Sequence, residues 1–165
     1  AGYSIAAASS NTLLGENSGY FLTTGAKNTI LGSYNGNLHA IDIRTSNNRV
    51  VLADGDGKPV YHANQGTDIQ TTSTTQTAIF TFDSGDYKAA KAVISANNGT
   101  DTYGTELLIA INNAESTIVA TEYGQLSTDT FTVTYDVDIS GGSARILATA
   151  PAATTTTYKV HIQLL

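Results

Sequence analysis

The sequence contains no cysteine, methionine or tryptophan and only two prolines. The absence of cysteine excludes disulfide bonds and metal sites with thiolate ligands, although it does not fix the cellular compartment. The sequence also lacks a run of about 18 apolar residues, which a membrane-spanning helix requires, and a charged and then apolar leader. We therefore expect a soluble chain that does not insert into a membrane.

Charged residues are also scarce, and they are distributed unevenly. Residues 1–66 contain four basic and four acidic residues, so the net charge of −6 falls on the rest of the chain. No basic run is present to neutralise nucleic-acid phosphates, and an anionic membrane would repel the chain, so we expect neither partner. The contrast predicts two domains, residues 1–66 and 78–165, joined by a polar junction, residues 67–77, that is either a linker or an edge strand.

The sequence does contain a 17-residue repeat at its start. Residues 2–18, GYSIAAASSNTLLGENS, are followed directly by residues 19–35, GYFLTTGAKNTILGSYN. The identical pairs are Gly2 and Gly19, Tyr3 and Tyr20, Asn11 and Asn28, Thr12 and Thr29, Leu14 and Leu31, and Gly15 and Gly32. Such a repeat indicates that one short supersecondary unit is formed twice, and that each copy needs a neighbour to cover its apolar face.

Each copy of the repeat is poor in aliphatic residues. The aliphatic positions are Ile5, Leu13 and Leu14 in the first copy and Leu22, Ile30 and Leu31 in the second. So few side chains do not offset a backbone ordering cost of about 1–2 kcal/mol per residue. We therefore expect the missing core to come both from further repeats upstream and from copies of the chain wound around a common axis. This predicts a parallel homotrimer whose core contains Leu13, Leu14, Ile30 and Leu31, with Leu14 and Leu31 facing the axis.

Residues 36–66 predict a hairpin that caps the repeats. Residues 48–52, NRVVL, echo the Asn-Thr-aliphatic start of the repeat at a spacing that has drifted to 20 residues. Residues 54–57, DGDG, then place two carboxylates in a tight loop, as calcium sites do, but the further acidic ligands of an EF-hand are missing. We therefore interpret the two Asp-Gly pairs as a hairpin turn, because Asp-Gly supplies the positive φ angles that such turns need.

From Ala78 onward, alternating apolar and polar residues predict about seven strands. They cover residues 78–83, 91–96, 106–111, 117–123, 131–140, 144–150 and 158–165. In the clearest of these, Phe131 and every second residue up to Ile139 are apolar. The segment ELLIAI, residues 106–111, is apolar on both faces and favours a central strand. The strands predict an antiparallel, jelly-roll-like β-sandwich, so the expected fold class is all-β: a trimeric β-repeat shaft with a hairpin cap, then a β-sandwich head.

Candidate sites for catalysis or metal binding are weak. Asp136 and Asp138 project from one strand face, as a glycosidase pair or a metal site would need, but they share one exposed environment and are better explained as solvated charges. His39, His62 and His161 are scattered, and we expect surface positions for them, although a histidine near a trimer axis would meet two copies of itself. No nucleophile, phosphate-loop or zinc-protease motif is present. We predict that the chain is not an enzyme and has no cofactor.

The nine tyrosines combine an apolar ring with a polar tip, as sugar-stacking and protein-contact surfaces do. Tyr3 and Tyr20 are repeat positions, so we expect structural roles for them. Tyr87, Tyr103 and Tyr123 lie near strand ends, where functional residues are common, and we predict that they form a receptor-binding rim. The loops expected to complete this rim are residues 84–87, 97–103, 112–116 and 124–129.

The stretch NTLLGENSGYFLTTGAKNTILGSYNGN and the later DIRTSNNRVVLADGDGKP resemble the repeat-and-cap region of tail-fibre and other virion structural proteins of tailed bacteriophages, most closely those of phages that infect cyanobacteria. The stretches TTQTAIFTF, ELLIAI and ATEYGQLS, with the Asp-Val-Asp-Ile segment, resemble domains that end such proteins. The resemblance implies a homotrimeric, non-enzymatic appendage of the virion, extracellular in location, with a shaft of short strands and a head that binds the host.

The resemblance also implies the partners, which are other fibre or tail proteins of the virion and a glycan or protein of the host surface. Three alternatives stay open. The head can be a purely structural knob that joins or caps an appendage, and the chain can be a fragment of a bacterial trimeric surface adhesin. The third alternative, a polysaccharide-degrading tailspike, calls for a larger core and evident catalytic carboxylates.

Overall fold

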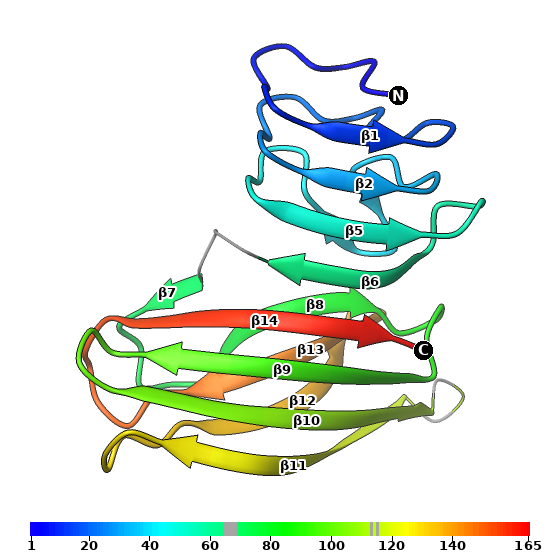
Figure 1. Ribbon diagram of the computed structural model, residues 1–165. Coiled ribbons are helices and arrows are strands. Elements are labelled where there is room, and N and C mark those ends of the chain that lie inside the picture. The colour runs from blue at the N-terminus through cyan, green and yellow to red at the C-terminus, as the bar shows by residue number, and fades with distance from the viewer. Residues whose placement is uncertain (65–68, 113, 115) are drawn as a thin grey trace. The chain divides into compact units, whose positions relative to one another are not determined.

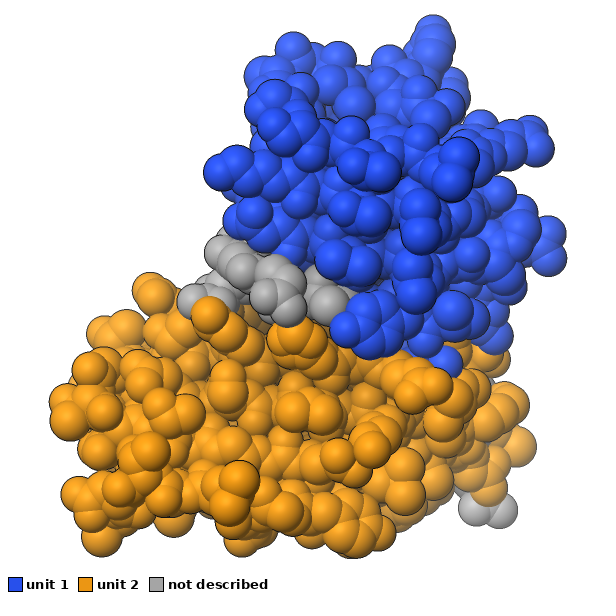
Figure 2. Space-filling model, in the orientation of Figure 1, with its two compact units in different colours: residues 1–67, 164 blue, residues 68–163, 165 orange. Residues whose placement is uncertain are grey.

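The computed structural model describes residues 1–64, 69–112, 114 and 116–165. It divides into two compact units, which Figure 2 shows in different colours: residues 1–67 with Leu164, named here the coil unit, and residues 68–163 with Leu165, named the sandwich unit. The described residues contain 14 β-strands, which confirms the all-β fold class. No helix among them is long and apolar enough to cross a membrane. That the two units fold independently stays a prediction.

The coil unit is built from three short parallel strands stacked in register (Figure 1). Its strands are β1 (Thr12–Leu14), β2 (Thr29–Leu31), β3 (Asn37–Leu38), β4 (Ile41–Asp42), β5 (Arg49–Ala53) and β6 (Pro59–Asn64). β1 pairs with β2, and β2 pairs with β5, so Leu13, Ile30 and Val51 lie in one row. Each repeat of the sequence is therefore one coil of a parallel solenoid, because identical residues one repeat apart become neighbours on adjacent strands.

The step from the second coil to the third is 21 residues, since Thr29 pairs with Val50. The spacing of 20 that the sequence suggested is therefore wrong by one residue. The added length contains the small antiparallel hairpin of β3 and β4. An insertion of this kind is accommodated outside the stacked strands, so their register is preserved.

The core of the coil unit lies within one chain. Leu22, Ile30, Tyr34 and Val51 are fully buried, and Ile43 is nearly so. The expectation that the core must be completed by other copies is therefore wrong. That expectation counted the apolar side chains of the two repeats alone, whereas the third coil adds others, such as Val51. Ile30 belongs to this internal core and Leu13 is half-buried, whereas Leu14 and Leu31 are exposed on the outer face.

Two repeated residue types have structural roles at the coil corners. An ideal Cβ atom on Gly32 would lie 2.0 Å from the carbonyl oxygen of Ala53, and Gly32 has a φ angle of 103°, so glycine is required there. The buried Asn28 side chain accepts a hydrogen bond from the Arg49 N–H at 2.8 Å and donates one to the Ser46 carbonyl at 2.9 Å. Asn11 makes the corresponding contact one coil earlier, where its Oδ1 accepts the N–H of Asn28 at 2.8 Å.

β5 and β6 pair antiparallel around residues 54–57, which confirms the predicted hairpin cap. The Asp54 carboxylate accepts the backbone N–H of Asp56 at 3.0 Å and that of Lys58 at 2.8 Å. Asp54 therefore closes the turn as an aspartate commonly does. On β6, His62 is buried, so its expected surface position is wrong.

The sandwich unit contains two sheets (Figure 1). The larger sheet consists of β7 (Ile69–Thr71), β14 (Thr156–Leu164), β9 (Ala89–Asn97), β10 (Thr102–Asn112) and β11 (Thr117–Ser127), and the smaller one of β12 (Thr134–Ser140), β13 (Ser143–Thr149) and β8 (Thr77–Asp83). Tyr103 of β10 packs against Tyr135 of β12, with ring centroids 6.2 Å apart. The sheets thus face each other across a core, which confirms the β-sandwich. β7 pairs with β14, so residues 69–71 of the junction form a strand; residues 67 and 68 lie outside the described residues, and the role of the junction as a whole stays a prediction.

One strand prediction needs correction. β10 lies between β9 and β11, as expected of a central strand, but only one of its faces is buried. Leu107, Ile109 and Ile111 face the core, whereas Leu108 is 46% exposed. The pattern ELLIAI therefore does not mark a strand covered on both sides. The outer face of β10 forms part of an exposed apolar surface on this side of the sheet.

Candidate functional site

The outer face of the larger sheet carries a group of exposed apolar side chains. They are Val93 on β9, Leu108 on β10, and Val119, Tyr123 and Leu126 on β11. Leu126 is the most exposed of them, at 74%. Single exposed apolar residues are common, but a group on one sheet face is typical of an interaction surface.

A groove of about 460 Å³, named here the sheet groove, opens on the same face. Its floor includes the cross-strand pair Ser95 and Gly104, both small residues. Beside them the register of β10 and β11 shifts, with Gly104 opposite Leu126 but Glu106 opposite Tyr123. Gly124 occupies this irregularity with a φ angle of 59°, a conformation that glycine adopts without strain. The sequence therefore forms a hollow here because small residues and a β-bulge coincide.

The walls of the sheet groove combine apolar and charged groups. Leu126 contributes an apolar wall, and Glu106, Lys159 and His161 contribute polar groups. Glu106 forms an ion pair with Lys91, with Nζ and Oε1 2.9 Å apart. An apolar lining with a few polar groups is the usual composition of a site that binds a small organic ligand. The arrangement is suited to binding a small ligand.

The three predicted rim tyrosines occupy different environments. Tyr87 is 1% exposed and packs edge-on against Phe82, with ring centroids 6.1 Å apart. Tyr103 is 4% exposed, whereas Tyr123 is 48% exposed and pairs with Glu106, which lines the sheet groove. The structure thus does not bring the three together at a rim, and of these only Tyr123 is accessible in this chain.

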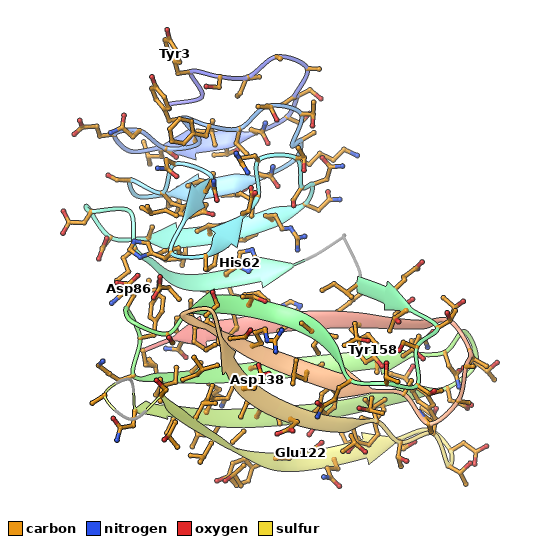
Figure 3. All side chains as sticks on the ribbon, turned by 180° about the vertical axis from the view of Figure 1, so that it is seen from behind. Tyr3, His62, Asp86, Glu122, Asp138 and Tyr158 are labelled. Atoms are coloured by element: carbon orange, nitrogen blue, oxygen red, sulfur yellow. The ribbon has the colours of Figure 1, made fainter. Side chains whose placement is uncertain are left out.

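Tyr103 supports the sheet from its inner side. Its hydroxyl donates a hydrogen bond to Oε1 of Glu122 at 2.9 Å (Glu122 is labelled on β11 in Figure 3). Burial raises the pKa of Tyr103 to about 12, and the hydrogen bond to Glu122 adds to the shift. Burial also raises the pKa of the neighbouring Tyr135. Tyr103 therefore stays neutral at ordinary pH and ties β10 to β11 beneath the groove.

The aspartates of β12 are engaged in structural contacts. Asp138, labelled in Figure 3, accepts a hydrogen bond from Nε of Arg145 at 2.7 Å, and this bond lowers the pKa of its carboxyl group. Asp136 accepts hydrogen bonds from the Gln76 side chain at 2.9 Å and from the Val137 N–H at 2.8 Å. Among the described residues, no three His, Cys, Asp or Glu side chains lie close enough together to hold a metal ion.

Sequence reasoning missed the sheet groove, although signals for it were present. Val93 and Leu108 are apolar residues on the solvent-facing positions of strands whose other positions are also apolar. Gly104 and Gly124 lie inside strands, where glycine often marks a bulge or a close approach of another molecule. Taken together, these positions mark the side of the sheet that carries the groove.

No protein-family model matches the sequence, and no curated protein matches it. Among solved structures, the chain is similar to the tailspike protein gp49 of Acinetobacter baumannii bacteriophage Fri1, described as a capsular polysaccharide depolymerase, with 16% identity and a TM-score of 0.39 over 64% of this chain and 19% of that one. It is also similar to the tailspike of Acinetobacter baumannii phage AM24, with 10% identity and a TM-score of 0.37 over 59% of this chain and 25% of that one.

A third similar structure is the tailspike of Acinetobacter phage vB_ApiP_P1, with 14% identity and a TM-score of 0.41 over 98% of this chain and 39% of that one. The chain thus spans less than half the length of each of these tailspikes. The TM-scores are low, so the fold is defined by the strand pairing described above. The closeness to phages of cyanobacteria that the sequence suggested is not supported.

Proposed function

We propose that the chain is a non-enzymatic structural part of a bacteriophage tail fibre or similar virion appendage, and that its sandwich unit is the host-receptor-binding head. The observation that carries the proposal is the exposed apolar face of the larger sheet, with the sheet groove and Tyr123 on it. The phage assignment itself rests on the resemblance of the repeats and hairpin cap to virion structural proteins. As part of an appendage, the chain is extracellular and contacts other fibre or tail proteins.

The appendage is proposed to be a parallel homotrimer that uses the outer face of the coil unit. Leu14, Leu31 and Leu52 are cross-strand neighbours in one row, and they are 68%, 38% and 38% exposed. A row of leucines on the surface is unfavourable in water and is stabilised when a second copy covers it. A trimer also presents three receptor sites, so weak individual contacts are strengthened by effective concentration.

Sedimentation at micromolar concentration tests the trimer. The variant Leu31→Asp should prevent assembly, because it places three carboxylates in one apolar layer at a cost of several kcal/mol per ion. It should leave the fold of the single chain intact, since Leu31 is partly exposed there. The matched control is Thr24→Asp, which adds the same charge at an exposed loop position and should assemble normally. A wild-type chain that sediments as a folded monomer would rule out the trimer.

Receptor binding is tested by adding the purified protein to host cells before the phage. We expect reduced phage adsorption, and we expect Gly104→Leu to abolish this protection. An ideal Cβ atom at Gly104 has no atom within 4 Å, and Gly104 lines the sheet groove, so a leucine side chain should start without a backbone clash and occupy the groove. Thr24→Leu is the control. Undiminished adsorption together with no binding of the wild-type protein to cells would leave a purely structural knob, and a bacterial chromosomal gene neighbourhood would favour the adhesin fragment.

Polysaccharide cleavage is a second candidate function. The observation that favours it is a groove in the coil unit that is lined by two carboxylates, Glu16 and Asp56. Paired carboxylates on either side of a sugar are the catalytic groups of most glycosidases. Release of reducing sugar from host capsule by the purified protein would replace the non-enzymatic proposal with this one.

A further inference from the structure

The coil unit has a corner at which three loops lie one above the other. These loops follow β1, β2 and β5, and Figure 1 shows them stacked at the arrowhead ends of the strands. The Gly32 N–H donates to the Leu14 carbonyl at 2.9 Å, and the Ser33 N–H donates to the Asp54 carbonyl at 3.1 Å. The three loops are therefore fixed to one another by backbone hydrogen bonds, and they form one continuous surface.

A groove of about 510 Å³, named here the coil groove, runs along this surface. The first loop contributes Glu16 and Asn17, the second contributes Asn35, and the hairpin turn contributes Gly55 and Asp56. The side of the groove is formed by the aromatic pair Tyr20 and Phe21. All of these residues belong to the coil unit, so the groove is complete within it.

The aromatic side of the groove is held in place by its surroundings. The Phe21 ring meets the Tyr20 ring edge-on, with centroids 5.0 Å apart, and Tyr20 stacks on Tyr3 at 4.9 Å. The Phe21 N–H donates to the Asn35 carbonyl at 2.8 Å, and the Tyr20 N–H donates to the Asn17 carbonyl at 2.9 Å. Phe21 is nonetheless 44% exposed. An ordered phenylalanine that faces solvent beside polar loops is a preformed stacking surface.

The polar side of the groove supplies both kinds of hydrogen-bonding group. Glu16 and Asp56 are exposed carboxylates that accept hydrogen bonds, whereas Asn17 and Asn35 carry amide groups that donate and accept. A sugar ring presents an apolar face and a rim of hydroxyl groups, which match an aromatic ring flanked by such groups. The residues that line the groove include two acidic side chains and no basic one, so an anionic sugar is disfavoured.

We propose that the coil groove binds a neutral oligosaccharide, with a sugar ring packed on Phe21 and hydroxyl groups donating to Glu16 and Asp56. This site is separate from the receptor-binding head proposed above and does not depend on it. The number of coils determines the length of the coil groove, because each coil adds one polar loop to the same corner.

The test is an NMR titration of the full chain with chitotetraose and maltotetraose as neutral probes and tetragalacturonate as the anionic one. We expect a neutral probe to shift the ring signals of Tyr20 and Phe21 at millimolar concentration, and tetragalacturonate to bind more weakly. Phe21→Ala should weaken binding by about threefold to tenfold, the worth of one aromatic stacking contact. Gly55→Leu should abolish binding, because Gly55 lines the groove and an ideal Cβ atom there has no atom within 4 Å, so the leucine side chain should occupy the groove. Thr24→Leu, outside the groove, should bind as the wild type does.

Three results would overturn the proposal: no shift with either neutral probe, shifts that persist in both Phe21→Ala and Gly55→Leu, or tighter binding of tetragalacturonate. The two proposals fail independently. Gly104→Leu changes only the sheet groove, so it should leave the signals of Tyr20 and Phe21 responsive even if the chain does not bind host cells.

Discussion

The coil unit and the sandwich unit are both built of β-strands, but they bury their residues by different rules. In the coil unit, Leu13, Ile30 and Val51 lie in register, so each layer of core repeats the layer before it. In the sandwich unit, burial alternates along β9, β10 and β14, and paired strands such as β8 and β13 are distant in sequence. A repeated fold needs particular residues at each corner, whereas an alternating fold needs only apolar residues on one face.

The polar residues show the same difference. Asn28 is fully buried in the coil unit, where it joins successive coils by hydrogen bonds. In the sandwich unit, Asp138 and Arg145 pair across strands and remain partly exposed. Removal of a polar side chain should therefore lower the free energy of unfolding more in the coil unit than in the sandwich unit. The four predictions below are ordered from the largest expected effect to the smallest.

Gly32→Ala should lower the free energy of unfolding of the coil unit by about 2–5 kcal/mol, because the new Cβ meets the Ala53 carbonyl and the φ angle is left-handed. Gly104→Ala is the control in the sandwich unit, where the Cβ has open space and alanine should be neutral or slightly stabilising. Urea unfolding followed by NMR signals of each unit measures both. Equal effects of the two substitutions would mean that the coil corners are not constrained as described.

Asn28→Ala should lower the free energy of unfolding by about 2–4 kcal/mol, since it leaves the Arg49 N–H and the Ser46 carbonyl without their buried partner. Asn28→Asp should also destabilise the coil unit, because it keeps the acceptor for the Arg49 N–H but buries a carboxylate beside the Ser46 carbonyl. The comparison in the sandwich unit is Asn97→Ala. The Asn97 side chain donates a hydrogen bond to the Thr102 hydroxyl at 2.9 Å and is only half-buried, so this substitution should lower the free energy of unfolding by about 1 kcal/mol. Urea unfolding measures all three variants, and a loss of stability for Asn97→Ala as large as that for Asn28→Ala would contradict the special role of the buried asparagine in joining successive coils.

Tyr103→Phe should lower the free energy of unfolding by about 1–2 kcal/mol at neutral pH, because Glu122 loses the hydrogen bond from the Tyr103 hydroxyl. The pKa of Tyr103 is raised from 10.0 to about 12, so the stability that the neutral hydroxyl contributes is present below pH 10 and is lost as pH rises through 12. The difference between wild type and variant should therefore shrink over this range. Unfolding curves at neutral and alkaline pH check it; a difference that does not change with pH would show that Tyr103 does not ionise in this way.

The smallest effect concerns two ion pairs of similar exposure. Arg145→Gln in the sandwich unit and Arg44→Gln in the coil unit should each lower the free energy of unfolding only slightly, and less at high salt, because both pairs are exposed to solvent. Because the hydrogen bond from each arginine lowers the pKa of Asp138 and of Asp42, this contribution is present above the unfolded value of 3.8 and is lost as pH falls below it. Chemical unfolding at neutral and acidic pH is the measurement, and a loss of stability as large as that of Asn28→Ala for either arginine variant would show that its ion pair is buried in an assembly.

Much of the fold was predictable from local pattern. The 17-residue repeat predicted the coil period, residues 54–57 predicted the hairpin turn, and the alternation in residues 131–140 predicted the strand that begins at Thr134. The candidate site was not predicted. Tyr103 was expected at the surface because it lies near a strand start, yet it falls on the same alternating positions as Leu107 and therefore points into the core.

The sequence by itself determined the period of the coils, the positions of the turns and the separation of charge, because each of these depends on residues that are neighbours along the chain. Only the tertiary structure decided which face of β10 is exposed, since a strand with apolar residues on both faces has no internal signal for the side that a second sheet covers. The same holds for the two grooves. Glu16 and Asp56 are 40 positions apart in the sequence and line one groove because stacking of the coils places their loops at the same corner.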